Sequence, residues 1–176
     1  VFGFPAQPDS SIRFIGGANY FYRLTVSTGP TYGAIHPAAL TRGTAATVSS
    51  WGWNLPEAVT TMPVTLPTEG VQGIPLEQDA LQRALVWGTA MPVLAEATEA
   101  TGRTLESRPV ALAGRLSQAN QRDRWKFTAK KGERLVFRGI ARALGSPTDL
   151  VLRILDPSGK SLQQVDDSVQ DEADIV

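Results

Sequence analysis

Apolar and polar residues alternate with a period of two along much of this chain, and this pattern predicts short β-strands with one buried and one solvated face. Between residues 124 and 129, for example, Trp125 and Phe127 alternate with basic and hydroxyl side chains. Residues 150–155 repeat the pattern with leucine and isoleucine. The strands predicted in this way are residues 19–27, 45–53, 60–66, 110–116, 124–129, 134–141, 150–155 and 160–165.

Turn residues mark the ends of these strands. Residues 156–159, Asp-Pro-Ser-Gly, favour a tight turn: the Asp side chain bonds back to the backbone, Pro fixes its own torsion and Gly accepts a left-handed one. This turn predicts a hairpin that joins the strands on either side of it. Pro63 restricts the strand at 60–66 to a sheet edge or a bulge, because proline has no N–H to donate.

One segment departs from the strand pattern. In residues 76–86, Leu81, Leu85 and the alanines beside them form a weak helical stripe. Glu77 and Asp79 lie near its start, where acidic side chains favour the helix dipole. We expect a short helix here, or a loop with one helical turn.

Composition narrows the class of protein. With 176 residues, 42% of them hydrophobic, the chain is long enough for one large or two small globular domains. It has no cysteine, which excludes disulfides, Cys-ligated zinc and thiol catalysis. The net charge is zero, so no global field favours nucleic acid, and no stretch is long and apolar enough to span a bilayer. We therefore expect an all-β protein with neither nucleic-acid partners nor membrane insertion.

The C-terminal half carries an ordered set of glycine, acidic and aromatic positions. Its members are Gly114, Asp123, Trp125, Phe127, Ala129, Lys131, Gly132, Leu135, Gly145, Ser146, Asp149, Asp156, Gly159, Asp166 and Asp167. In this order the set resembles the bacterial pre-peptidase C-terminal domain. Members of that family carry D-x-D-x-[FYW]-x-F, A-x-K-G-x-x-[LV], G-S-x-x-D and D-x-x-G motifs, followed by a D-D pair. The resemblance covers about residues 92–176.

The resemblance implies a secreted, periplasmic or surface-attached bacterial β-sandwich of jelly-roll type. Residues 31–95 look like a smaller immunoglobulin-like sandwich that acts as a spacer, and residues 1–30 look like the closing strand of a preceding module. We therefore expect three parts, 1–30, 31–95 and 96–176, in a fragment of a larger exported protein. The last part is expected to lack its final strands. Its partners would be neighbouring modules of the same polypeptide or other envelope proteins.

Some members of this family bind calcium, which takes six to eight hard oxygen ligands. The resemblance points to Glu96, Glu99, Asp123, Asp149, Asp166 and Asp167 as the candidate ligands. The acidic opening of the family is altered here, because its Pro, Asn and Asp are missing from residues 96–100. This change favours the alternative, in which the acids cap turns and keep the surface soluble.

Trp51 and Trp53 lie two residues apart, so on a strand they share one face. An exposed pair would suit stacking on a sugar or a protein, whereas a buried pair would pack between sheets. Because large aromatic side chains dominate protein cores, the pattern favours core packing. Gly52 between them suits a bulge or the close approach of another backbone. The basic residues between 122 and 142 are interpreted as solvated strand faces and a hairpin turn.

Catalysis is not expected. His36 is the only histidine and precedes Pro37 in a predicted linker, and neither G-x-S-x-G nor H-E-x-x-H occurs. We therefore predict a non-catalytic structural and adhesive module of a secreted or cell-envelope protein, with calcium as a candidate stiffening ion. The alternative is an accessory module of a secreted hydrolase that binds protein or polysaccharide through Trp51 and Trp53.

Overall fold

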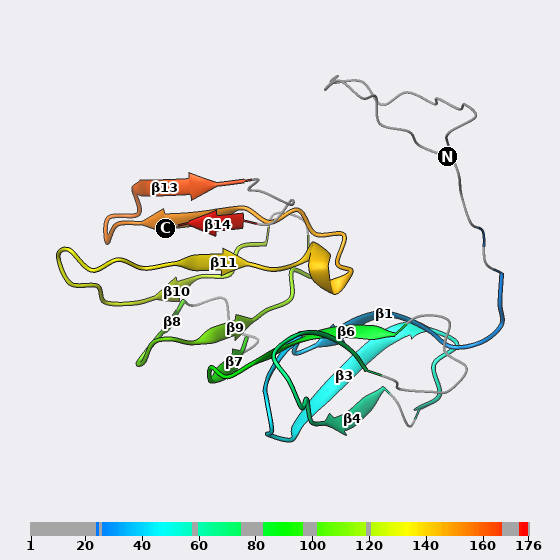
Figure 1. Ribbon diagram of the computed structural model, residues 1–176. Helices are drawn as coiled ribbons and strands as arrows, with labels where there is room; N and C mark the ends of the chain where they lie inside the picture. The colour runs from blue at the N-terminus through cyan, green and yellow to red at the C-terminus, as the bar shows by residue number, and fades with distance from the viewer. Residues whose placement is uncertain are drawn as a thin grey trace, which may run out of the picture.

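The computed structural model describes residues 24, 26–57, 60–74, 83–96, 102–118, 121–166 and 173–175. Across this part of the chain the protein is all-β, as the alternating pattern predicts. Short strands form several small sheets of the sandwich type. A short 3-10 helix, η2 (Arg142–Leu144), separates strands of two of these sheets along the sequence. Figure 1 shows two groups of strands, one built by residues 31–89 and the other by the residues that follow.

The first group consists of two three-stranded sheets. Its strands are β1 (Thr31–His36), β2 (Ala39–Thr41), β3 (Ala46–Trp53), β4 (Thr61–Val64), β5 (Gly70–Ile74) and β6 (Ala84–Thr89). In one sheet β3 lies between β1 and β4, with antiparallel pairing on both sides. In the other sheet β6 lies between β2 and β5, and its pairing is parallel to β2 and antiparallel to β5.

An aliphatic core lies between these two sheets. Leu40 on β2, Val48 on β3 and Val86 on β6 are each at most 1% exposed. The cluster around them draws buried side chains from all six strands. Burying one such side chain contributes roughly 1.5–3 kcal/mol, so this cluster is the main source of stability for the first group.

The predicted strands at 45–53 and 60–66 are confirmed as β3 and β4. Pro63 lies on β4, which is the edge strand of its sheet, as the missing N–H of proline requires. The strand predicted at 19–27 is not supported where it is described. Leu24 and Val26 lie outside any strand and are 78% and 87% exposed, and most of the remaining residues of that segment lie outside the described part.

The helical prediction for residues 76–86 is wrong where it can be checked. Residues 84–86 belong to β6, in which Ala84 and Val86 point into the core and Leu85 between them is less buried. This period of two overrides the weak helical stripe, because the core takes one side of a strand. Residues 75–82 lie outside the described part of the chain.

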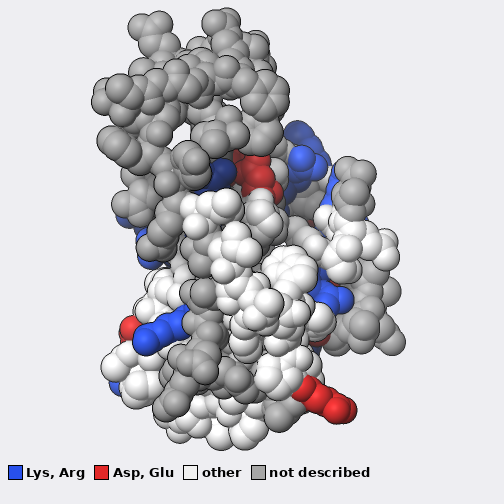
Figure 2. Space-filling view, turned by 90° about the vertical axis from the view of Figure 1, so that its right-hand side faces the viewer, with Lys and Arg blue, Asp and Glu red and all other residues white. Residues whose placement is uncertain are grey.

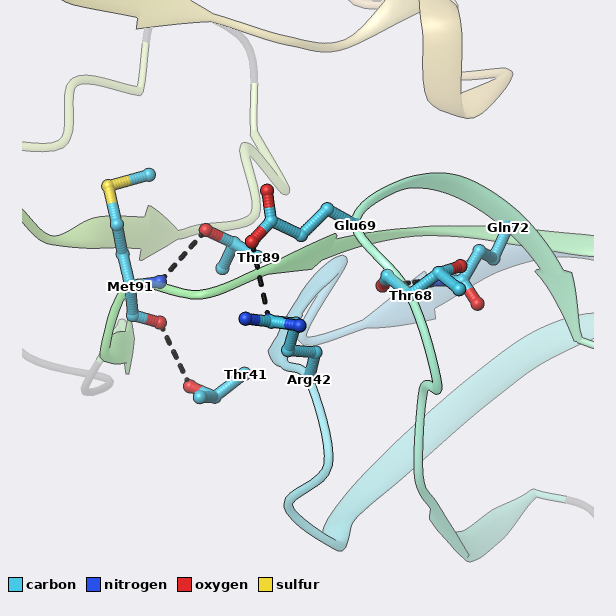
Figure 3. A network of polar contacts seen from close by, with 7 residues as sticks. All are labelled: Thr41, Arg42, Thr68, Glu69, Gln72, Thr89 and Met91. Atoms are coloured by element: carbon cyan, nitrogen blue, oxygen red, sulfur yellow. Dashed lines mark hydrogen bonds and ion pairs between the residues drawn. The ribbon is translucent and has the colours of Figure 1, made fainter.

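Polar contacts close one end of the first sandwich (Figure 3). The Thr41 hydroxyl donates to the carbonyl oxygen of Met91 at 3.0 Å, and the Met91 amide donates to the Thr89 hydroxyl at 3.1 Å. Arg42 forms an ion pair with Glu69 at 3.3 Å. These contacts connect the loop after β2 with the loops before β5 and after β6. They therefore hold the parallel strands β2 and β6 together at one end of their sheet.

The second group is built from pairs of shorter strands. They are β7 (Val93–Ala95), β8 (Arg103–Thr104), β9 (Ala111–Ala113), β10 (Trp125–Lys126), β11 (Phe137–Gly139), β12 (Leu152–Leu155), β13 (Ser161–Val165) and β14 (Ala173–Ile175). β7 pairs with β9 and β8 with β10 in parallel, whereas β11 pairs with β14 and β12 with β13 antiparallel. The predicted strands of this half are therefore confirmed in position but most are shorter than predicted.

Burial in the second group is thinner than in the first. Among its described residues only Ala113, Gly139, Ala141 and Ile175 are buried, while Val136 and Leu162 are 67% and 66% exposed. An aromatic pair, Phe127 and Phe137, packs with ring centroids 5.4 Å apart. This half therefore relies on a few half-buried side chains.

The predicted hairpin at residues 156–159 is confirmed, together with its mechanism. Asp156 Oδ1 accepts hydrogen bonds from the Ser158 amide at 2.8 Å and the Lys160 amide at 2.9 Å. Gly159 has a φ of 89°, the left-handed conformation that glycine adopts without steric cost. These bonds favour the carboxylate and hold the pKa of Asp156 below its ordinary value, with the Ser158 hydroxyl as the largest cause.

No helix in the described part of the chain has the length and apolar character needed to cross a membrane.

The uneven burial of the two groups predicts an uneven response to truncation. Leu40→Ala should destabilise the protein by about 2–5 kcal/mol, because it opens a cavity in the first core. Leu162→Ala should change stability by less than about 0.5 kcal/mol, because that side chain is already solvated. Urea denaturation followed by fluorescence measures both. Equal losses in the two variants would contradict this assignment of the core.

Candidate functional site

Two candidate calcium ligands, Glu96 and Asp123, meet above Gly114. β7 and β9 pair in parallel, and the Glu96 amide continues this ladder by donating to the Ala113 carbonyl at 2.7 Å. Glu96 and Gly114 therefore leave the two strands side by side. Asp123 Oδ2 and Glu96 Oε2 lie 3.0 and 3.3 Å from the point that a Cβ atom of Gly114 would occupy. A side chain at position 114 would displace both carboxylates, so glycine keeps this space open.

Neutral donors hold the two carboxylates in place. The Arg115 amide donates to Glu96 Oε2 at 3.0 Å. The Gln121 side chain donates to Asp123 Oδ1 at 3.0 Å and to the Arg115 carbonyl at 2.9 Å. Its own oxygen accepts a hydrogen bond from the Ser117 amide at 2.8 Å. Gln121 therefore orients Asp123 relative to Glu96, a role that nothing in the sequence pattern indicated.

The other predicted calcium ligands are not brought to this pair. Asp149 and Asp166 are exposed, and within the described residues no three acidic or histidine side chains gather in a group able to hold a metal ion. Glu99 and Asp167 lie outside the described part of the chain. The carboxylates of Glu96 and Asp123 thus lie close together, and they are the two predicted calcium ligands that the structure brings together.

Trp51 and Trp53 are exposed, so the interpretation that favoured core packing is wrong. They are 41% and 68% exposed, while Val48 and Ser50 on the opposite side of β3 are buried. The core takes the even-numbered positions of β3 and leaves the tryptophans on the outer face of the sheet. Gly52 lies between them at a bulge in the β1–β3 pairing, where a Cβ atom would collide with the Thr31 carbonyl. The close backbone approach predicted for Gly52 is therefore confirmed.

Arg115 connects the two groups of strands. Its guanidinium carbon lies 4.9 Å from the centroid of the Trp51 ring, a cation–π contact between the segment after β9 and strand β3. Its main-chain N–H is the one held by Glu96. One residue therefore joins the outer tryptophan to the carboxylate pair. The period-two pattern offered no signal for this contact, because it links segments more than 60 residues apart in sequence.

His36 lies in a strand and not in a linker, which corrects the prediction for this residue. It is the last residue of β1 and lies opposite Ser49 on β3. Partial burial and the positive charge of Arg115 hold its pKa below the ordinary value, and the charge of Glu96 opposes them. The imidazole of His36 makes no hydrogen bond to any described residue.

Two hollows in the described part of the chain contain no cluster of reactive groups. One, of about 270 Å³, lies between β2 and β7 and is lined by Pro37, Leu40, Val93 and neighbouring small residues. The other, of about 30 Å³, is lined by Arg83 and by aliphatic residues of β1 and β6. Figure 2 shows one side of the molecule, where the visible charged side chains stand mostly singly around an uncharged surface.

Comparison of the chain with models of protein families, with curated proteins and with solved structures finds no match. The resemblance to the pre-peptidase C-terminal domain therefore remains a prediction from the motif order.

The environment of His36 predicts a dependence of stability on pH. Because the pKa of His36 is lowered in the folded protein, the unfolded chain binds the proton more readily. Stability should therefore be full above the unfolded pKa of about 6.5 and should fall as the pH drops through and below that value. Melting temperatures at pH 8, 6 and 5 measure this loss. His36→Gln should lack this component, and a variant that loses stability as steeply as the wild type would contradict it.

Proposed function

We propose that this chain is a non-catalytic structural and adhesive segment of a secreted or cell-envelope bacterial protein, in which two β units are held at a defined angle. The observation that carries this proposal is the junction at Arg115. Its guanidinium stacks on Trp51 of the first unit while its backbone is bonded to Glu96 and Gln121 of the second. A cation–π contact contributes about 0.5–2 kcal/mol, enough to bias the angle between two units that share one linker.

A stiffening role for calcium fits the same junction. Glu96 and Asp123 lie beside Arg115, and their carboxylates lie close together on the same side of Gly114. A bound divalent cation would neutralise their mutual repulsion and would fix the ends of β7 and β9. The remaining ligands would come from water.

The alternative function is substrate targeting for a secreted hydrolase, and one specific observation favours it. Trp51 and Trp53 are exposed on the outer face of a sheet, where Trp53 in particular is accessible to a ligand. A spacer alone has no use for two exposed tryptophans, because such side chains favour association. Adhesion and targeting both use this face, so the two functions are compatible in one module.

Calcium binding predicts a thermal shift that depends on the pair. An ion that binds only the folded state stabilises it by about 2.7 kcal/mol at one hundred times its Kd, so millimolar calcium should raise the melting temperature. The shift should disappear in Asp123→Asn and Glu96→Gln. It should persist in Asp149→Asn, a matched change at an acid that stands apart from the pair. Magnesium is the control ion, because it demands a tighter octahedral site.

An unchanged melting temperature in the wild type would remove calcium from the proposal without touching the junction. Loss of the shift in Asp149→Asn alone would place the ion elsewhere.

Rigidity of the junction is measurable because the chain has no cysteine of its own. Spin labels on Thr47→Cys and Lys160→Cys report the distance between the two units. We expect a narrow distribution in the labelled wild type and a broader one in Trp51→Ala, which removes the ring under Arg115. Val71→Ala is the matched control, since Val71 is also 41% exposed but lies on β5 of the other sheet. A broad distribution before any change at Trp51 would overturn the structural proposal.

A further inference from the structure

The outer face of the β1–β3–β4 sheet has an unusual composition. Directly opposite residues of paired strands share a face, so the residues that pair with Trp51, Trp53 and Ser49 lie on the same side as they do. Besides the two rings this side carries the hydroxyl groups of Thr31, Thr47, Ser49 and Thr61. We name it the tryptophan face. None of the three strands contributes a carboxylate to it.

Trp53 is the accessible ring of this face. It is 68% exposed, and its six-membered ring lies beside Gly33, which has no side chain to cover it. Trp51 is partly covered by the guanidinium of Arg115. The face therefore presents one open aromatic surface next to one cation.

Arg115 brings a positive charge that forms no ion pair with a described carboxylate. Its side chain is exposed, and its guanidinium forms no hydrogen bond or ion pair with any described residue. Glu96 and Asp123 lie near its backbone, and Glu96 Oε2 accepts the backbone N–H of Arg115. The side-chain donors of Arg115 are thus available, and a guanidinium offers paired N–H groups that match a carboxylate.

We propose that the tryptophan face binds an acidic polysaccharide, with a sugar ring stacked on Trp53 and a uronate carboxylate paired with Arg115. This inference rests on the adhesive part of the proposed function and names its ligand. The flat apolar face of a pyranose matches an exposed indole ring. The neighbouring threonine and serine hydroxyls donate to and accept from sugar hydroxyls.

Size and charge favour this ligand over a protein or a nucleic acid. Each of the two rings offers at most about 150–250 Å², and a stable protein interface needs about 800 Å² on each side. Nucleic acid requires a track of cations along the backbone as well as stacking rings, and this face has only Arg115 as a permanent cation. A sugar polymer can bind with measurable affinity when the protein offers one aromatic ring and one cation to each repeating unit.

Affinity electrophoresis tests the proposal with two matched polymers, polygalacturonate and its methyl ester, which share the sugar ring and differ in charge. We expect saturable retardation of the wild type by polygalacturonate and binding about tenfold weaker to the ester. Trp53→Ala should weaken binding to both polymers by at least about tenfold, because it removes the stacking surface. Arg115→Gln should weaken binding to polygalacturonate only.

Two matched variants control for surface changes in general. Val71→Ala removes an exposed apolar side chain from the other sheet, and Arg134→Ala removes an exposed cation from the second group of strands. Both should bind as the wild type does. Trp53→Ala should leave the spin-label distance unchanged, so loss of binding is distinguishable from failure of the junction.

Several outcomes would overturn the proposal. They are equal binding to the acid and its ester, unchanged binding in Trp53→Ala, and no retardation of the wild type. Competition by a single-stranded oligonucleotide would indicate nucleic acid instead. A dimer in light scattering that dissociates in Trp53→Ala would show that the face binds a second copy of the chain.

Discussion

The packing of two small sheets over one aliphatic core is the constraint on which the rest of this structure depends. Because Val48 and Ser50 must point inward, Trp51 and Trp53 must point outward, and the tryptophan face follows from the core. A shift of one residue in the register of β3 would bury both rings and expose the core. The exposed tryptophans are therefore as strongly specified as the buried valine.

The second group of strands depends on the first for its position. Arg115 lies on Trp51, and η2 lies close to β6, so contacts with residues 31–89 supplement the thin burial of the later strands. The same arginine is bonded through its backbone to the carboxylate pair. A cation–π contact and two carboxylates are thus concentrated around one short segment between β9 and β10.

The sequence was sufficient for features that are decided locally. Alternation located β3, β4 and the strands of the second half, and the turn chemistry of Asp156 and Gly159 identified the β12–β13 hairpin. It was insufficient where tertiary packing decides between two local options. The alternation within a single strand does not show which of its two faces is buried, so Trp51 and Trp53 were assigned to the wrong side. In the same way, the weak helical stripe at Leu85 predicted a helix where strand β6 forms, because the core accepts Ala84 and Val86 from one side. Of the six predicted calcium ligands, two converge, and the parallel pairing of β7 with β9 that unites them has no signature in a single sequence.

The parallel pairing of β2 with β6 has a mechanical consequence. β2 lies near the beginning of the first sandwich and β6 at its end, so tension along the polypeptide pulls these neighbours in opposite directions along their shared ladder. Their hydrogen bonds are then strained together in shear, whereas an antiparallel hairpin pulled at its open ends unzips one bond at a time. A module built in this way would resist stretching along the axis on which a tethered surface protein is loaded.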